Sequence, residues 1–490
     1  IYQDTAWNYV WNLKRSDIEL HKAHWNDHGY VPVHDILTWP GNGDASLGQA
    51  TQLAPFHDVN NDDIYDPLSG DCPAIRGDQC LFFIFNDDRG AHLESKGTKL
   101  RIEIHGMAYA YNLPCDSAFS KTIFINYKVY NRSAQTYHNA WIGTFTDMEI
   151  GYSQDDLIQC DVGRSSIIGH TGKAIDGSGQ PWAYGAHPPA QSVTLLAGPG
   201  MAKTGYDRPR YDNSGHPLCN ESTNGYGFGD GIADNERLGL HAFMTFGPSN
   251  LSTPVYNDGP STPEQYYNYM NATWIDSTHM IYGGNGHPGH GGYGPAAQFM
   301  FPGESDTLNW GCGCQPPNGP VNWTETTAGN LPHDISGMGA TGPFTFHAGE
   351  MQEFDLAFVW ARDYTSTDSL ASVVKLRTMI DTVRKAFYTN QLPGGGAFLA
   401  TPEIFHVLNA SCNIYPNPAR SFVTVGFITP LKEQTTLEVF DFSGKLMQVY
   451  SLQKGITKYG MDCSGYSPGL YLLHIKSNDK RFIKKLAVIH

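Results

Sequence analysis

Short runs of apolar residues, or of alternating apolar and polar residues, recur through the first 360 residues and predict β-strands. Six such runs lie at residues 80–85, 99–105, 121–130, 139–148, 191–197 and 240–246. Two more occupy residues 344–360, where residues 347–350 supply a turn. This last stretch predicts a β-hairpin of the kind that closes a sandwich.

Two segments carry a helical pattern instead. Residues 368–388 place apolar side chains at a spacing of three to four residues, which predicts a helix packed on the sheet by one face. Near the start of the chain, Ser16 is followed by Glu19 three residues later, a pattern typical of a capped helix N-terminus. We expect this helix to end near Trp25.

Long segments rich in Gly, Pro, Asn and Tyr separate the strands, at residues 161–190, 198–237 and 247–340. They exceed ordinary loops in length, so we expect calcium, packed aromatic side chains or a partner to order them. The pattern predicts a mainly β protein: a large β-rich body over residues 1–400, with long loops and a few helices. A break into two subdomains near 190–240 is possible, and residues 401–412 read as a linker.

The last part of the chain, residues 413–490, has a denser strand pattern. Strands are expected at residues 421–427, 435–441, 445–452, 469–476 and 482–489, with turn sequences between them. So many short strands in so few residues predict a small immunoglobulin-like β-sandwich.

Charge separates the two parts of the chain. The formal net charge is −16, yet residues 413–490 contain ten Lys and Arg against five Asp and Glu. The first 412 residues therefore carry a net −21, the difference between −16 and +5. An acidic body argues against a nucleic-acid partner, whose phosphates need cations, and is compatible with divalent cations. No apolar run reaches the length of a transmembrane segment.

Nine cysteines are present, and their spacing does not match a zinc site. Cys72 and Cys80 flank a short loop and are the first candidates for a disulfide. An oxidising compartment is the expectation. The chain starts at Ile1 without the charged and apolar regions of a signal peptide, so any such peptide is expected to have been removed.

Four short motifs follow one another in residues 413–490: Tyr-Pro-Asn-Pro at 415–418, Asp-Phe-Ser-Gly-Lys at 441–445, Pro-Gly-Leu-Tyr at 468–471 and Lys-Lys-Leu at 484–486. Their order and spacing resemble the type A C-terminal sorting domain of the type IX secretion system. The residues that carry the resemblance are Pro416, Asn417, Pro418, Asp441, Gly444, Pro468, Gly469, Tyr471, Lys484 and Lys485.

The resemblance implies export through the periplasm and the outer membrane to the cell surface or the extracellular space. Its implied partners are the type IX translocon and the outer-membrane shuttle protein, recognising residues 413–490. In the family, a surface sortase usually removes this tail. Body segments such as residues 39–43, 85–88 and 103–107 resemble a group of large proteins that carry the same tail and have no assigned activity.

An acidic segment of the body predicts a calcium site. Oxygen-bearing residues recur at every second position from Asp58, as in the first half of an EF-hand-type or dockerin-type loop. The expected ligands are Asp58, Asn60, Asp62, Ile64 through its carbonyl, Asp66 and Asp71. The sixth position has Asp63 in place of the usual Gly, and the twelfth has Ser69 in place of Glu, for which Asp71 is the expected substitute. A solvated acidic turn is the alternative.

A second candidate calcium site follows a Gly-rich approach. Its expected ligands are Asp230, Asp234 and Glu236. The alternative is a turn that leads into a short helix capped by Asp234.

No nucleophile elbow, zinc-protease motif, phosphate loop or dinucleotide fingerprint is found in the sequence. We therefore expect no enzymatic activity, and a structural or adhesive role in which a glycan or another surface protein is a possible partner. The alternative is a secreted polysaccharide hydrolase or a carbohydrate-binding protein, because paired carboxylates are spaced in the fold and not in the sequence.

Overall fold

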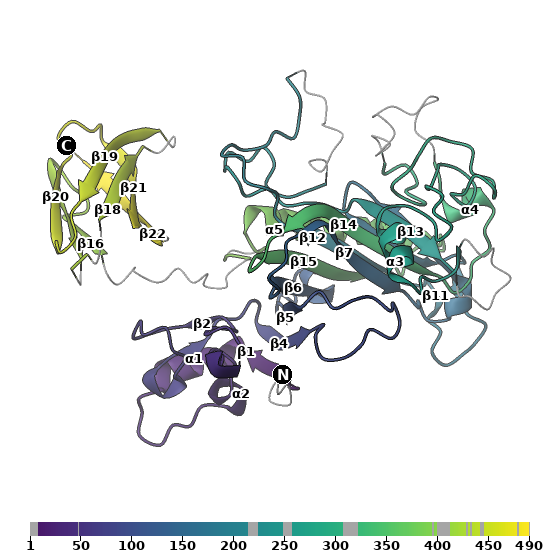
Figure 1. Ribbon diagram of the computed structural model, residues 1–490, viewed down its shortest axis with the longest axis horizontal. Coiled ribbons are helices and arrows are strands. Elements are labelled where there is room, and N and C mark those ends of the chain that lie inside the picture. Colours follow the sequence, from purple (N-terminus) through teal and green to yellow (C-terminus); the bar gives the residue numbers. More distant parts are fainter. Residues whose placement is uncertain are drawn as a thin grey trace. The chain divides into compact units, whose positions relative to one another are not determined.

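The computed structural model describes residues 8–489, with the exception of 48, 214–223, 248–256, 307–321, 394–395, 399–411, 428–429, 432–433, 442–444 and 478–479. The chain forms two compact units, Ile1–Ala400 and Thr401–His490. Strands predominate over helices in both, as Figure 1 shows, and this confirms the predicted mainly β class.

An eight-stranded antiparallel sheet is the centre of the larger unit (Figure 1). Its strands, in spatial order, are β1 (Trp11–Lys14), β4 (Gln79–Asn86), β5 (Ile102–Ala110), β6 (Thr122–Asn131), β15 (Met351–Ala361), β12 (Ala190–Ala197), β9 (Ser166–Thr171) and β8 (Asp156–Asp161). A three-stranded sheet contains β13 (Ala242–Phe246), β14 (Ser336–Phe346) and β7 (Tyr137–Asp147). Two short pairs are β2 (Phe56–His57) with β3 (Cys72–Pro73), and β10 (Ile175–Asp176) with β11 (Gly185–Ala186).

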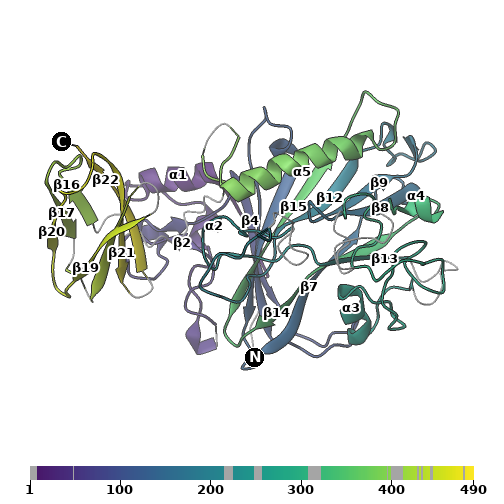
Figure 2. The ribbon, with the colours of Figure 1, turned by 90° about the horizontal axis from the view of Figure 1, so that it is seen from above.

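The helices of this unit are α1 (Arg15–His24), α2 (His34–Leu37), α3 (Pro263–Met270), α4 (Glu325–Ala328) and α5 (Ala371–Thr389). Helix α5 crosses one face of the large sheet, against β12 and β15 (Figure 2). Its apolar stripe, which includes Val373, Leu376 and Ile380, is buried there. The predicted helix over 368–388 is thus present and packs on the sheet as expected.

The large sheet is buried on both faces at β9 and β12, where neighbouring residues of one strand point to opposite faces. Ile168 and Leu196 belong to the apolar cluster beneath α5. Their neighbours Ile167 and Leu195 belong to a second cluster, shared with β13 and β14 of the smaller sheet. The body is therefore a helix, a large sheet and a small sheet in three layers.

The predicted hairpin over residues 344–360 is wrong. Strands β14 and β15 are both present, but β14 pairs with β7 and β13, whereas β15 pairs with β6 and β12. Residues 347–350 therefore carry the chain from the small sheet to the large one. The alternation of apolar and polar residues is the same for a hairpin and for a crossover between two packed sheets.

Two further expectations are corrected by the structure. Residues 161–190 were expected to be irregular, yet they contain β9, an inner strand of the large sheet. Ser16 lies inside α1, which has Lys14 at its N-cap position and no side-chain capping bond there. The strand β1 runs directly into α1, so the backbone turns into the helix before Ser16 is reached.

A buried ion network ties β15 to two loops. The Asp355 carboxylate accepts from Arg76 Nη1 at 2.8 Å and from Arg237 Nη1 at 2.7 Å, and Arg76 Nη2 lies 3.0 Å from Glu353 Oε1. Asp355 is 1% exposed. Charges this deeply buried require one another, because each would otherwise lose its hydration without a partner.

The smaller unit is a β-sandwich. One sheet contains β16 (Cys412–Tyr415), β17 (Phe422–Phe427) and β20 (Lys458–Asp462). The other contains β19 (Leu446–Leu452), β18 (Thr435–Phe440), β21 (Gly469–Ser477) and β22 (Lys480–Val488). Alternate residues of each sheet, such as Val423, Val439 and Leu473, form the core. The immunoglobulin-like sandwich predicted for the tail is confirmed.

The disulfide predicted between Cys72 and Cys80 is wrong, because both are free, buried thiols. Cys72 lies in the small β2–β3 pair and Cys80 in the large sheet, so closeness in sequence does not bring the two sulfur atoms together. Burial raises the pKa of the Cys72 thiol to about 12, which leaves it unreactive. Among the described residues, no helix is both long and apolar enough to span a membrane.

Candidate functional site

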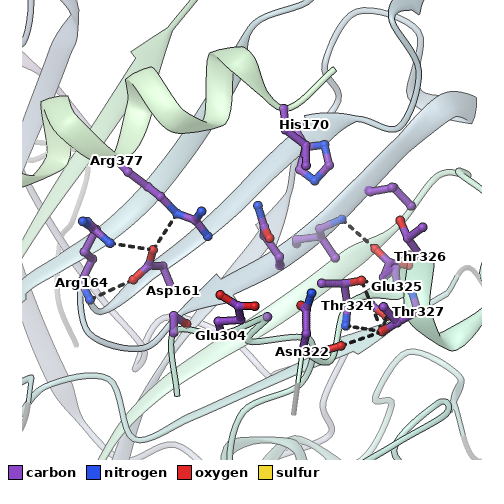
Figure 3. A pocket seen from close by; sticks show the side chains of 16 residues that line it. Asp161, Arg164, His170, Glu304, Asn322, Thr324, Glu325, Thr326, Thr327 and Arg377 are labelled. Carbon is purple, nitrogen blue, oxygen red and sulfur yellow. Dashed lines mark hydrogen bonds and ion pairs between the residues drawn. The ribbon is translucent and has the colours of Figure 1, made fainter. Parts of the chain in front are cut away.

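A polar cavity of about 600 Å³ opens between one end of the large sheet, α5 and α4 (Figure 3). Strands β8 and β9 supply its wall, Arg377 reaches in from α5, and residues 303–305 and 322–327 form the opposite side. Its labelled lining residues are Asp161, Arg164, His170, Glu304, Asn322, Thr324, Glu325, Thr326, Thr327 and Arg377. Donors, acceptors and charged groups of both signs thus converge on one space.

Two arginines share one buried carboxylate at the end of the cavity nearest α5. Asp161, whose side chain is 1% exposed, accepts from Arg377 Nε at 2.9 Å and from Arg164 Nη1 at 3.1 Å. Arg164 is bound on its other side by both carboxylate oxygens of Asp381, each at 2.8 Å. Asp161 therefore holds Arg377 in a fixed orientation.

His170, on β9, is neutral in this setting. Burial lowers its pKa, and the positive charge of Arg377 lowers it further. The ring atom Nδ1 lies 3.1 Å from the carbonyl oxygen of Thr171. A carbonyl only accepts, so Nδ1 carries the hydrogen and Nε2 keeps its lone pair. His170 is therefore an acceptor at Nε2.

Glu325, the first residue of α4, is a buried carboxyl group at the opposite end. It is 2% exposed, and this burial raises its pKa to about 7. The backbone N–H of Ile158 donates to Oε1 at 2.7 Å and partly offsets that effect. Near neutral pH the group is thus divided between acid and carboxylate, as a proton donor requires.

The acidic segment that begins at Asp58 is folded around its own backbone. The Asp58 carboxylate accepts from the N–H groups of Asn61 and Asp63, at 2.6 and 2.7 Å. Asp63, where a calcium loop usually has Gly, has a φ of 62°, the left-handed region that Gly favours. Asp62 accepts from the N–H of Ile64 at 2.8 Å.

The end of this segment is closed by one further carboxylate. Asp71 is buried and accepts from the N–H groups of Val59 and Asp66, both at 2.8 Å. Burial raises the pKa of Asp71, and the charges of Asp58 and Asp62 add to the effect. Asn60 donates to Asp62 at 2.9 Å. Within the described residues, no three His, Cys, Asp or Glu side chains are placed to hold a metal ion.

The three carboxylates of the second acidic segment, residues 230–236, do not converge on one point. Asp230 accepts from the N–H of Ile232, while Asp234 accepts from Thr204 and Gly205. Glu236 accepts from the N–H of Arg208. These three carboxylates each bind backbone, and the last two fasten residues 204–208 to residues 230–236. Calcium stays a prediction for both segments.

In the smaller unit, the first and last of the four motifs lie side by side. The Asn417 side chain accepts from the N–H of Ala487 at 2.9 Å, and Ala419 forms a parallel bridge with Val488. Pro416 and Pro418 flank Asn417, and both follow cis peptide bonds. Lys484 and Lys485 belong to β22. The two ends of the unit are thus joined.

The other two motifs form turns. Asp441 accepts from the N–H of Lys445 at 3.0 Å, which closes the turn before β19. The Tyr471 hydroxyl donates to the Ser467 carbonyl at 2.8 Å, so that it encloses Pro468 and Gly469. Gly444 lies outside the described residues.

Residues 413–489 match the family model described as secretion system C-terminal sorting domain. The chain is a cargo protein of the type IX secretion system. Its sorting domain indicates export out of the cell, toward the surface or the extracellular space, and an interaction with the secretion machinery. The resemblance stated from the four motifs is confirmed.

Two solved structures resemble the chain, but too weakly to support an argument about the body. No curated protein matches the chain. A solved polysaccharide lyase is 8% identical with a TM-score of 0.18, over 79% of this chain and 34% of the lyase. The chain thus spans about a third of that protein's length. The BSP domain of a biofilm-associated protein is 9% identical with a TM-score of 0.15, over 85% of this chain and 81% of that domain.

Sequence reasoning missed the cavity entirely. Its charged residues come from β8, α4, α5 and the loops that contain Arg164 and Glu304, and Asp161 and Arg377 are 216 positions apart. None of them belongs to a motif. The only available signal was the apolar stripe of α5, because it places this helix on the sheet that supplies Asp161.

Proposed function

We propose that the translocon and its outer-membrane shuttle protein recognise residues 413–490 and carry the chain through the periplasm to the cell surface. The sorting domain supports this route, because it is a separate compact unit. The test is deletion of residues 413–490 in the native host, with culture fractions probed by an antibody against the body. The expected result is a folded body retained in the periplasm. Secretion of the truncated chain at the normal level contradicts the route.

The mature body has an adhesive role and binds glycan in the cavity beside α5. The observation that carries this proposal is the lining, in which an arginine, a neutral histidine, amides and threonine hydroxyls face one space of about 600 Å³. Sugar rings offer many hydroxyl groups, which such donors and acceptors bind with defined geometry. A structural role at the surface is compatible with the same binding.

A glycan array with the full chain tests this function. Thr326 is exposed and lines the cavity, so Thr326→Trp fills space there with little effect on the fold. Thr51→Trp, at another exposed threonine, is the matched control. We expect glycan binding by the wild type and by the control, with a loss of at least tenfold in Thr326→Trp. Equal binding by all three proteins contradicts the assignment of the cavity.

A second candidate is hydrolysis of a polysaccharide in the same cavity. Glu325 favours it, since a buried carboxyl group with a pKa of about 7 suits a general acid, and Glu304 is a second carboxyl group in the lining. The test is release of reducing ends from surface polysaccharides, with Glu325→Gln as the inactive variant. Binding without any release of reducing ends excludes hydrolysis and leaves the adhesive role.

Calcium is part of the proposal as a stabilising ion at residues 58–71. The left-handed Asp63 supports it, because the backbone turns at the sixth position as in a loop that has Gly there. Residues 58, 60, 62, 64 and 66 would hold the ion, and Asp71 is the additional carboxylate. Bound calcium would neutralise part of the charge of this segment.

A further inference from the structure

The guanidinium of Arg377 is anchored at one end and open at the other. Its Nε donates to Asp161 at 2.9 Å, and within the described part of the chain the two Nη atoms have no hydrogen-bonding partner. Figure 3 shows these outer nitrogens turned away from Asp161, toward the space of the cavity. The side chain is 32% exposed, so the open end is accessible.

The anchor is itself rigid. Asp161 is buried among the two arginines, and the N–H of Arg164 adds a bond to Asp161 Oδ1 at 3.2 Å. Arg164 is paired on its far side with Asp381, so it does not compete for a ligand of Arg377. A guanidinium that is fixed before binding loses little conformational freedom when a ligand arrives.

Two parallel N–H groups of a fixed guanidinium match the two oxygens of a carboxylate. We infer that the cavity recognises an acidic glycan, and that the Nη1 and Nη2 atoms of Arg377 bind the carboxylate of a uronic-acid residue. This inference rests on the proposed glycan-binding function and names the ligand class. A carboxylate fits better than a sulfate ester because it is planar and presents both oxygens on one edge.

The rest of the lining suits the hydroxyl groups of the same sugar. His170 Nε2 accepts a hydrogen bond, since Nδ1 is committed to the Thr171 carbonyl. Gln159 and Asn322 offer both donors and acceptors. Asp161 and Asp381 balance the charge of the two arginines, and Glu304 adds a carboxyl group to the lining. Binding of an acidic sugar therefore depends on directed hydrogen bonds from Arg377 and is not a general attraction for anions.

The test compares three probes on the full chain by calorimetry: an oligogalacturonate, its fully methyl-esterified form, and a sulfated neutral oligosaccharide. Esterification removes the charge of the carboxylate and keeps the sugar ring and its hydroxyls. We expect the oligogalacturonate to bind at least tenfold more tightly than the ester, and more tightly than the sulfated probe. Arg377→Lys keeps the charge and loses the paired donors, so it should abolish this preference.

The outcomes separate the two proposals. Equal affinity for acid and ester overturns the inference and leaves glycan binding intact. Tighter binding of the sulfated probe overturns it as well. Absence of binding by every oligosaccharide refutes both. If Arg377→Lys does not fold, as judged by its fluorescence melt, the ratio of acid to ester in the wild type still decides the question.

Discussion

Replacement of Glu325 by Gln should change how the stability of the body depends on pH. Glutamine keeps the shape and still accepts from the N–H of Ile158, which donates to Glu325 at 2.7 Å. It cannot ionise. The wild-type carboxyl is 2% exposed, and burial raises its pKa from 4.5 to about 7. The folded chain therefore binds this proton more tightly than the unfolded chain does.

The sign and size of the effect follow from that difference. A raised pKa means that Glu325 is compatible with folding while it is protonated, and that stability is lost as the pH rises from about 4.5 to about 7. At about 1.4 kcal/mol for each pH unit, the loss is about 3 kcal/mol by pH 8. Relative to the wild type, the variant should thus gain about 3 kcal/mol between pH 4.5 and pH 8.

Urea unfolding at several pH values, followed by tryptophan fluorescence, measures this difference. All ten tryptophans precede residue 413, so the signal reports on the body and not on the sorting domain. Asp156, whose pKa burial raises to about 8, contributes in the same direction but is present in both proteins and cancels in the comparison. Glu94→Gln, at an exposed glutamate, is the control. If the stability curves of the wild type and Glu325→Gln run parallel in pH, the reasoning is refuted.

Three further predictions concern other parts of the chain. Asp355→Ala should lower the free energy of unfolding of the body by about 3 kcal/mol in urea, because Arg76 and Arg237 lose the buried carboxylate that they share and keep only Glu353 as an acidic neighbour; a loss below about 1 kcal/mol contradicts this account. Asp58→Ala combined with Asp62→Ala should remove the dependence of the melting temperature on calcium, and a wild type that melts identically with calcium and with chelator contradicts the site. Asn417→Ala should destabilise the sorting domain by about 1 kcal/mol through loss of the bond to Ala487, measured by amide hydrogen exchange in β22; unchanged protection there argues against a role for this bond.

Local sequence was sufficient for the sorting domain. Its strands alternate with period two, its turns carry Asp441 and Pro468, and its core is complete within one short stretch of chain. Such a unit needs few contacts from distant parts of the sequence. The same holds for α5, whose apolar stripe predicts both the helix and the face that is buried.

The alternation of apolar and polar residues does not show which strands pair with each other. Strands β14 and β15 follow one another like the two arms of a hairpin, yet they belong to different sheets. Alternation shows which residues are buried but not against which strand, because every inner strand offers the same apolar face. The expected disulfide was wrong for a related reason, since Cys72 and Cys80 are close in sequence but lie in different sheets.

The amino-acid sequence was enough to show that the chain is mainly β, because strands follow from local periodicity. It was also enough to show that the last residues are a secretion signal, because short motifs identify that domain. The cavity depends on the fold of the whole body. Asp161, Glu325 and Arg377 come together only when α5 packs on β12 and β15 and α4 packs against β8. The raised pKa of Glu325 and, among the described residues, the free Nη atoms of Arg377 arise from burial and from neighbours distant in sequence. No local sequence pattern predicts these two properties.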